Sequence, residues 1–318
     1  MYAKRAIRYL TVLLSFVLVL SMAGITHAAV VTYNLKAGVT TVVMPDGVPV
    51  RMVGFGLSNE PVTVPGPVLE ANAGDTLTIN LNNPLPVPIT IVIHGQKIAV
   101  PAPVMLGGRV LSFTPHSGTF SFPDLREGTY LYESGTYTAA EVPIGLYGAL
   151  IVRSATPGQA YDDPVSAYDS EQILVFSDVD PTLNQAVVTR QYGTPSYPST
   201  VDYAAKYFLI NGKAYPNTAP IVADNADRVL LRLVNAGSKN YNPTLNGPYM
   251  KLIAQDGNLL PYSQDRISVL LSAGKTKDVI VTSDPDMQYA LYDRQLNLSN
   301  AGSPGVGGML TFLQFGNP

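Results

Sequence analysis

The 318 residues of this chain are enough for two domains of ordinary size, and a hydrophobic content of 46% can supply a core for each. The formal net charge is −3, and no basic run or basic–aromatic patch interrupts the sequence, which argues against nucleic-acid binding. Cysteine is absent, which excludes disulfides within the chain and any thiolate metal ligand.

Residues 1–28 have the composition of an export signal. Three basic residues near the start precede an apolar segment, 10–25, and Thr26 and Ala28 supply small residues at the positions expected for cleavage. A retained membrane anchor is the alternative, but the apolar segment is short for a spanning helix, which needs about 20 residues. We predict a signal peptide over 1–28, a periplasmic or extracellular protein, and no integral membrane segment after removal of the signal.

The rest of the chain shows the patterns of β-strands. Residues 76–81 alternate polar and apolar side chains with a period of two, as in a half-buried strand. Residues 89–94 alternate only partly and are more apolar, and 148–152 form a short apolar run, so both segments suit strands buried on both faces. No sustained helical period follows the signal, so the sequence predicts an all-β fold of sandwiches or barrels.

Residues 154–171 are rich in Pro, Gly, Ser and Asp and carry no strand pattern, which predicts a linker. It would separate a first domain over 29–153 from a second over 172–318. The two halves also echo each other: PGPVLEANAGDTLTINLNNPLP in the first corresponds to YPNTAPIVADNADRVLLRLVNAGS in the second. Both run from proline through a short strand and an acidic turn to a strong strand, which indicates a tandem repeat of one β-fold.

Several separated motifs carry a specific resemblance. VPGPVLEANAGDTLTINLNNPL (64–85), GTYLYESG (128–135) and VPIGLYGALIV (142–152) resemble the first cupredoxin domain of multicopper oxidases. FLINGKAYPN, RVLLRLVNAGS, LIAQDGNLL and LLSAGKTKDVIV resemble, in that order, the middle domain of the same family. The resemblance spans about residues 45–315 and implies two tandem cupredoxin-like Greek-key β-sandwiches.

The resemblance also shows where copper ligands would stand. The family's H-x-H-G motif corresponds to VIHG, so Val92 replaces the first histidine and His94 keeps the second. The family's Y-H-S-H motif corresponds to YESG, where Glu133 and Gly135 replace both histidines. After signal removal the only histidines are His94 and His116, and blue copper needs a thiolate that this chain cannot supply.

His94 has two interpretations. As a metal ligand it would bind copper with Glu133 as a neighbour, because the family brings these strands together. As a structural residue it would pack at the end of its strand and make one hydrogen bond, which we favour. His116 is expected in a solvated turn, and Met309 stands near a possible axial position with no other ligand beside it. We expect no cofactor, and copper if any.

Two functional hypotheses remain. The first is an exported, copper-free multicopper-oxidase-like protein that acts as a binding, scaffold or assembly component of the bacterial envelope or exterior. It would work through protein partners or self-association, and not as an enzyme. The second is a copper-binding or oxidase-related protein with a reduced metal site around His94 and Glu133, completed at a subunit interface. Any enzymatic activity would then be that of an oxidoreductase.

Overall fold

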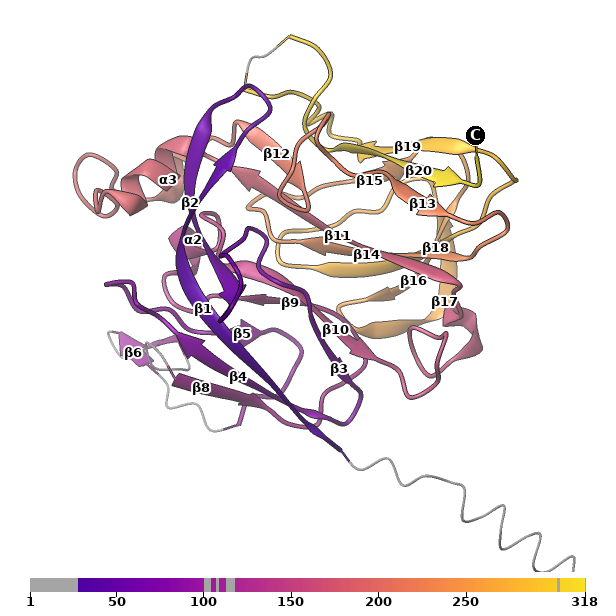
Figure 1. Cartoon of the computed structure of the whole chain (residues 1–318), viewed down its shortest axis with the longest axis horizontal. Coiled ribbons are helices and arrows are strands. Elements are labelled where there is room, and N and C mark those ends of the chain that lie inside the picture. The colour runs from indigo at the N-terminus through magenta and orange to yellow at the C-terminus, as the bar shows by residue number, and fades with distance from the viewer. Residues whose placement is uncertain (1–27, 100–103, 107–108, 113–117, 302–303, 318) are drawn as a thin grey trace, which may run out of the picture.

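The computed structural model describes residues 28–99, 104–106, 109–112, 118–301 and 304–317. Two β-sandwiches follow one another along the chain, the first coloured indigo to magenta and the second pink through orange to yellow in Figure 1. This arrangement confirms the predicted all-β fold of two tandem cupredoxin-like sandwiches. The predicted signal peptide falls almost entirely outside the described residues, and so does His116. Within the described ranges, no helix is long and apolar enough to cross a membrane.

The first sandwich faces a sheet ordered β2-β1-β4-β8 with a sheet ordered β3-β10-β9-β5. Its strands are β1 (Val30–Val43), β2 (Pro49–Leu57), β3 (Leu69–Asn72), β4 (Thr76–Asn82), β5 (Val92–Ile93), β8 (Gly118–Phe122), β9 (Gly128–Glu133) and β10 (Tyr147–Arg153). A separate hairpin joins β6 (Val104–Leu106) to β7 (Arg109–Ser112). The alternating sequence of β4 buries Leu77, Ile79 and Leu81 in the core, as its period predicts.

The second sandwich has a six-stranded sheet ordered β12-β11-β14-β18-β16-β17 and a four-stranded sheet ordered β13-β20-β19-β15. Its strands are β11 (Ser170–Val179), β12 (Tyr207–Ile210), β13 (Ile221–Ala223), β14 (Val229–Asn235), β15 (Pro243–Leu245), β16 (Met250–Gln255), β17 (Asn258–Arg266), β18 (Thr276–Val281), β19 (Gln288–Asp293) and β20 (Leu310–Phe315). The turn between β16 and β17 places Asp256 and Gly257 in the left-handed conformation, as expected for an Asp-Gly hairpin.

The two sandwiches repeat one pattern of strand pairing. β1 runs parallel to β4 in the first, and β11 runs parallel to β14 in the second. Likewise β3 runs parallel to β10, and β13 parallel to β20. The strands β4 and β14 lie within the two segments whose sequences echo each other. The pairing therefore supports the tandem repeat predicted from those segments.

Two local expectations were wrong. The strand expected over 89–94 is reduced to β5, because the Thr90 hydroxyl accepts the Gly135 backbone N–H at 3.0 Å, where a longer ladder would use a backbone carbonyl. The second half also contains the helix α3 (Pro181–Val188), which begins with Asp180 accepting the Thr182 N–H and with proline in its first turn. Shorter helical turns are α2 (Thr138–Glu141), η1 (Pro164–Ser166) and η2 (Thr200–Asp202).

A buried polar junction ties the two sandwiches together. The Arg232 guanidinium, in the middle of β14, donates to the Glu171 carboxylate at 2.8 Å and to the Thr129 hydroxyl of β9 at 3.0 Å. The Asp278 carboxylate accepts from Thr129 and from the Tyr161 hydroxyl, each at 2.6 Å. Burial raises the pKa of Asp278, which Arg232 and these hydrogen bonds oppose. The first sandwich is therefore fixed to the second through strand β9.

An apolar cluster accompanies this junction. It combines side chains from both sandwiches: Met44, Val50, Met52, Val64, Leu131, Val142, Tyr147, Ala149, Val175, Val179, Tyr207, Leu209, Ala214, Val234 and Ala236. Because such a cluster removes apolar surface from water, it favours one fixed arrangement of the two halves. Each sandwich also has a core of its own.

Candidate functional site at the end of strand β9

Strand pairing brings His94 and Glu133 together. β5 pairs with β9 so that Val92 lies opposite Glu133 and Ile93 lies opposite Tyr132. His94 directly follows β5, and its Nε2 lies 3.2 Å from Glu133 Oε1. The structure therefore makes these two residues the spatial neighbours that the motifs suggested.

The two partners differ in their exposure to solvent. The His94 side chain is 70% exposed, whereas that of Glu133 is 9% exposed. The hydrogen bond to Glu133 raises the pKa of His94, with partial burial opposing it and the charge of Glu133 adding to it. A pair with one partner in solvent contributes little to stability, typically about 0–1 kcal/mol.

Val92 and Gly135, the two other positions that correspond to copper ligands in the family, pack against each other. A Cβ atom at Gly135 would lie 2.5 Å from Val92 Cγ1 and 2.9 Å from Thr90 Oγ1. The Thr90 hydroxyl also meets the Thr136 hydroxyl at 3.0 Å. Side chains of residues 90 and 92 therefore fill the space that a side chain at position 135 would need. No signal local to either motif could have revealed this contact.

Ser134 and Glu141 form a second buried pair beside this contact. The Ser134 hydroxyl donates to Glu141 Oε2 at 2.5 Å, and both residues are buried. Burial raises the pKa of Glu141 to about 8, with the hydrogen bond from Ser134 acting in the opposite direction. The serine kept within the YESG motif thus binds a carboxyl group that is protonated at neutral pH.

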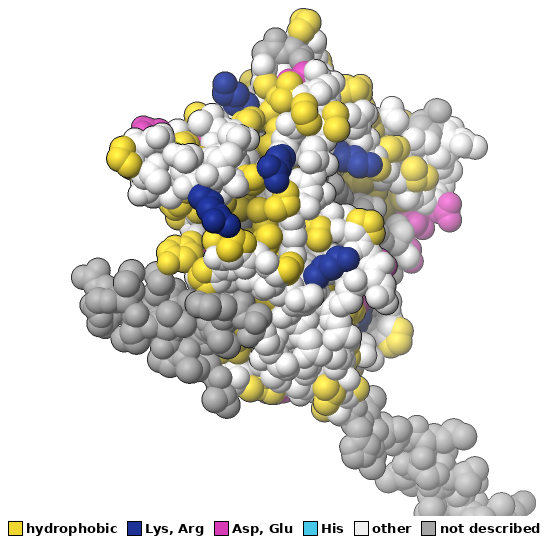
Figure 2. All heavy atoms as spheres, turned by 60° about the vertical axis from the view of Figure 1, so that its left-hand side comes forward, with side chains coloured by type: hydrophobic (Ala, Val, Ile, Leu, Met, Phe, Trp, Pro, Cys, Tyr) yellow, Lys and Arg dark blue, Asp and Glu magenta, His cyan; other side chains and the backbone are white. Residues whose placement is uncertain are grey.

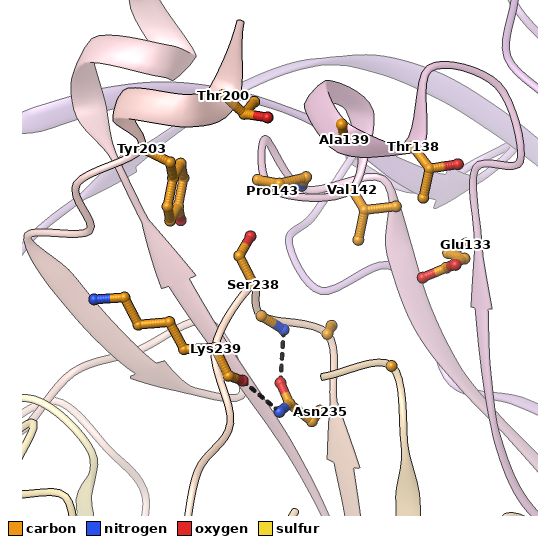
Figure 3. A pocket seen from close by; sticks show the side chains of 13 residues that line it. Glu133, Thr138, Ala139, Val142, Pro143, Thr200, Tyr203, Asn235, Ser238 and Lys239 are labelled. Carbon is orange, nitrogen blue, oxygen red and sulfur yellow. Dashed lines mark hydrogen bonds between the residues drawn. The ribbon is translucent and has the colours of Figure 1, made fainter. Parts of the chain in front are cut away.

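A cleft of about 500 Å³ opens beside Glu133, between the two sandwiches (Figure 3). One wall is α2 with the turn that follows it, and the other consists of η2 and the loop 235–239 after β14. Buried Asn235 holds this loop, because its amide donates to the carbonyls of Lys239 and Leu271 and its Oδ1 accepts the Gly237 N–H. The cleft is therefore preformed, with Glu133 at one end.

Known proteins resemble the chain in sequence. A profile of the multicopper oxidase family matches residues 40–157. Laccase-3 of Thanatephorus cucumeris is 26% identical over 288 residues, which make up 82% of this chain and 46% of the relative. Copper resistance protein A of Pseudomonas syringae pv. tomato is 24% identical over 263 residues, or 69% of this chain and 41% of the relative. Residues 40–157 therefore match a multicopper oxidase domain, and the chain is similar to members of that family over most of its length.

Solved structures of multicopper oxidases share the fold. The blue copper oxidase from Nitrosomonas europaea is 23% identical, with a TM-score of 0.72, and the match covers 90% of this chain and 86% of that one. Multicopper oxidase mgLAC is also 23% identical, with a TM-score of 0.73, and the match covers 91% and 86%. At this identity the likeness shows the fold alone. The chain spans less than half the length of the two curated relatives described above.

The residues at the four multicopper oxidase ligand positions do not fit a copper cluster. One imidazole, His94, and one carboxylate, Glu133, are the metal-binding side chains there, whereas Val92 and Gly135 offer none. In the part of the chain that the structure describes, no three His, Cys, Asp or Glu side chains gather where they could hold a metal ion. Met309 is fully buried in the core of the second sandwich, among apolar side chains. We therefore derive no redox step through copper.

Proposed function

We propose that this chain is an exported, copper-free member of the multicopper oxidase family that acts as a binding, scaffold or assembly component of the bacterial envelope or exterior. The packing of Val92 against Gly135 carries the proposal. A site that had merely lost its metal would keep room for its ligands, whereas here the side chains of Thr90 and Val92 fill that room. The fold is kept in use without the chemistry that the family is named for.

The retained stabilising contacts support a scaffold role. Arg232 and Asp278 are buried charges that persist only when paired and hydrogen-bonded, and both contact the first sandwich through Thr129. A protein under no requirement to hold its two halves together would not need such a junction. Its function therefore depends on the shape of the whole molecule.

The surface supports protein partners or self-association. Figure 2 shows hydrophobic and basic side chains gathered on the face at the left of Figure 1, with few acidic ones among them. On β1 and the turn after it, Val39, Val43 and Val48 are exposed. Exposed apolar groups next to charges of one sign are typical of surfaces that bind other proteins. Cross-linking of the protein in its native envelope, followed by identification of the linked chains, would reveal such partners.

Oxygen consumption tests the proposal. The mature protein is incubated with Cu(II), desalted and supplied with a phenolic donor, and a laccase treated in the same way serves as the positive control. We expect no oxygen uptake above the rate given by free copper at the same concentration. Donor-dependent uptake by the desalted protein would contradict the proposal.

A second candidate function rests on the exposure of His94. Its side chain is 70% exposed and already paired with a carboxylate, so residues from another subunit could add ligands to it. This candidate is a copper-binding or oxidase-related protein whose reduced site is completed at a subunit interface. Calorimetric titration with Cu(I) and Cu(II) of the wild type and of His94→Ala tests it, since equally weak binding by both would eliminate the site.

A further inference from the structure

We infer that the cleft between the two sandwiches binds a small organic cation through a primary ammonium group held by Glu133. The inference extends the proposed function by naming a ligand class for a non-catalytic protein. It concerns an oxygen of Glu133 that the pair with His94 leaves available.

The Glu133 carboxylate is largely buried, and one of its oxygens faces the cleft. Its side chain is 9% exposed, and Oε1 contacts His94. Among the described residues Oε2 has no partner, yet it is not sealed inside the protein, because Glu133 lines the cleft and its carboxylate points into it (Figure 3). A carboxylate that is nine-tenths buried and half-paired strongly favours a cationic partner.

The cleft lining also contains hydroxyl groups that can accept hydrogen bonds. The hydroxyls of Thr200 and Ser238 line the cleft and make no hydrogen bond within the described part of the chain. Thr138 donates to the Ser134 carbonyl at 3.4 Å, which leaves its oxygen free to accept. Three hydroxyl oxygens and a carboxylate oxygen are acceptors, and an ammonium group brings three N–H donors and no acceptor.

The positive charge in the cleft lining, that of Lys239, lies away from Glu133. Lys239 is the cation of the cleft lining, but its ammonium lies over the Phe208 ring, 5.5 Å from the ring centre. In Figure 3 it lies at the opposite side of the cleft from Glu133. Lys239 therefore does not compete for the carboxylate. Val142 and Pro143 give the same cleft an apolar wall, which suits a ligand whose ammonium is attached to a hydrocarbon body.

A divalent metal fits the same position less well. A hard cation such as Ca²⁺ takes six to eight oxygen ligands, usually with several carboxylates among them. Glu133 is the carboxylate of this lining, and the loop 235–239 turns the Asn235 oxygen toward the Gly237 N–H. The volume of about 500 Å³ also suits an organic molecule better than a single ion.

Benzylamine and benzyl alcohol are matched probes, because they differ in charge but hardly in shape. Each is titrated into the ¹⁵N-labelled mature protein, and the backbone amide signals of Gly237, Ser238 and Lys239 are followed. We expect saturable shifts with benzylamine and an affinity at least about tenfold lower for benzyl alcohol. Equal affinity for the two probes would overturn the inference.

Variants assign the interaction to Glu133. We expect Glu133→Gln to weaken benzylamine binding about tenfold and to leave benzyl alcohol unaffected, whereas Glu60→Gln, on an exposed turn, changes neither. His94→Ala should keep benzylamine binding, because it removes the partner of Oε1 only. If Glu133→Gln does not fold, Ser238→Ala replaces it, with an expected loss of about threefold. Unchanged binding in the variant that folds would overturn the inference.

The inference and the proposed function fail separately. Copper-dependent oxygen uptake would contradict the copper-free function even if benzylamine binds. Absence of benzylamine binding would overturn the inference and leave the copper-free function intact.

Discussion

The two ends of strand β9 lie in the same sheet but hold polar groups of different kinds. At its start, Thr129 joins Arg232 and Asp278 in a buried network that links the sandwiches. At its end, the Glu133 side chain pairs with the exposed imidazole of His94 and with no other side chain among the described residues. The first is a complete set of interactions between buried groups, and the second leaves a carboxylate oxygen unused. The network at the start of β9 therefore serves to hold the two sandwiches together.

The two ends of β9 thus differ in what their polar side chains hold together. β9 pairs with β10 and β5 and so holds its sheet of the first sandwich together, while Glu133 at its end has one imidazole as a partner and Gly135 offers no side-chain ligand. Substitutions at the two ends of β9 and in the contacts beside them should therefore differ in their effects on stability.

The largest effect is expected at the junction. Arg232→Met should lower the free energy of unfolding by about 3–5 kcal/mol, because it leaves the buried carboxylate of Asp278 without its cation, whereas the partly buried Glu171 keeps its pair with Arg153. Chemical denaturation of both proteins measures the difference. Lys97→Ala is the control, since the Lys97–Asp124 pair is exposed and its loss should cost less than about 1 kcal/mol. Equal effects of the two substitutions would show that the junction is not essential.

At the other end of β9, Gly135→Ala should destabilise the protein by about 1–3 kcal/mol, because the new Cβ meets Val92 Cγ1 at 2.5 Å. Val92→Ala in the same chain should recover part of this loss. A double-mutant cycle measures the coupling between the two positions. Strictly additive effects would contradict the packing on which the proposed function rests.

Glu141→Gln should stabilise the protein at alkaline pH. The pKa of Glu141 is about 8 in the folded state against an ordinary 4.5, so its contribution to stability is full below pH 4.5 and is lost as the pH rises to 8. We expect the variant to match the wild type at pH 4.5 and to exceed it at pH 8 by on the order of 1–3 kcal/mol. Thermal unfolding of both proteins across this pH range measures the difference. If the stability of the two proteins changes with pH in the same way, the pKa of Glu141 is not raised.

The smallest effect concerns His94. NMR titration should give a pKa above the ordinary 6.5, and Glu133→Gln should lower it, because the hydrogen bond to Glu133 is the main cause of the shift. The stability from this pair is present below pH 6.5 and is lost as the pH rises through the raised pKa. His94→Ala should cost less than about 1 kcal/mol. An unshifted pKa for His94 would mean that the pair does not form in solution.

Much of the fold was predictable from local patterns. The period of two in β4 and the apolar run in β14 are properties of a few consecutive residues, and the repeated segments predicted the repeated pairing. The helix α3 was missed because eight residues are too few for a sustained helical period. The sequence nevertheless indicates where the helix starts, because Asp180 followed by proline favours a helix N-terminus.

The candidate site was predictable only in part. The motifs brought His94 and Glu133 together because strand pairing in the family is known. The contact between Val92 and Gly135 depends on packing between two segments that are far apart in the sequence, which no local pattern records. Arg232 and Asp278 were visible as charges inside apolar strands, yet their partner Thr129 lies in the other sandwich. The sequence alone could not reveal these contacts, because each joins side chains from segments that are far apart in the chain.

Retention of copper by the purified protein decides whether this fold lacks a working copper site. The mature protein is loaded with Cu(I) and with Cu(II), desalted, and its copper content per chain is determined by mass spectrometry of the metal. We predict well under one tightly held copper ion per chain, and no change on His94→Ala. One or more copper ions per chain that survive desalting, and that are lost on His94→Ala, would contradict the claim that this fold has been kept without its copper site.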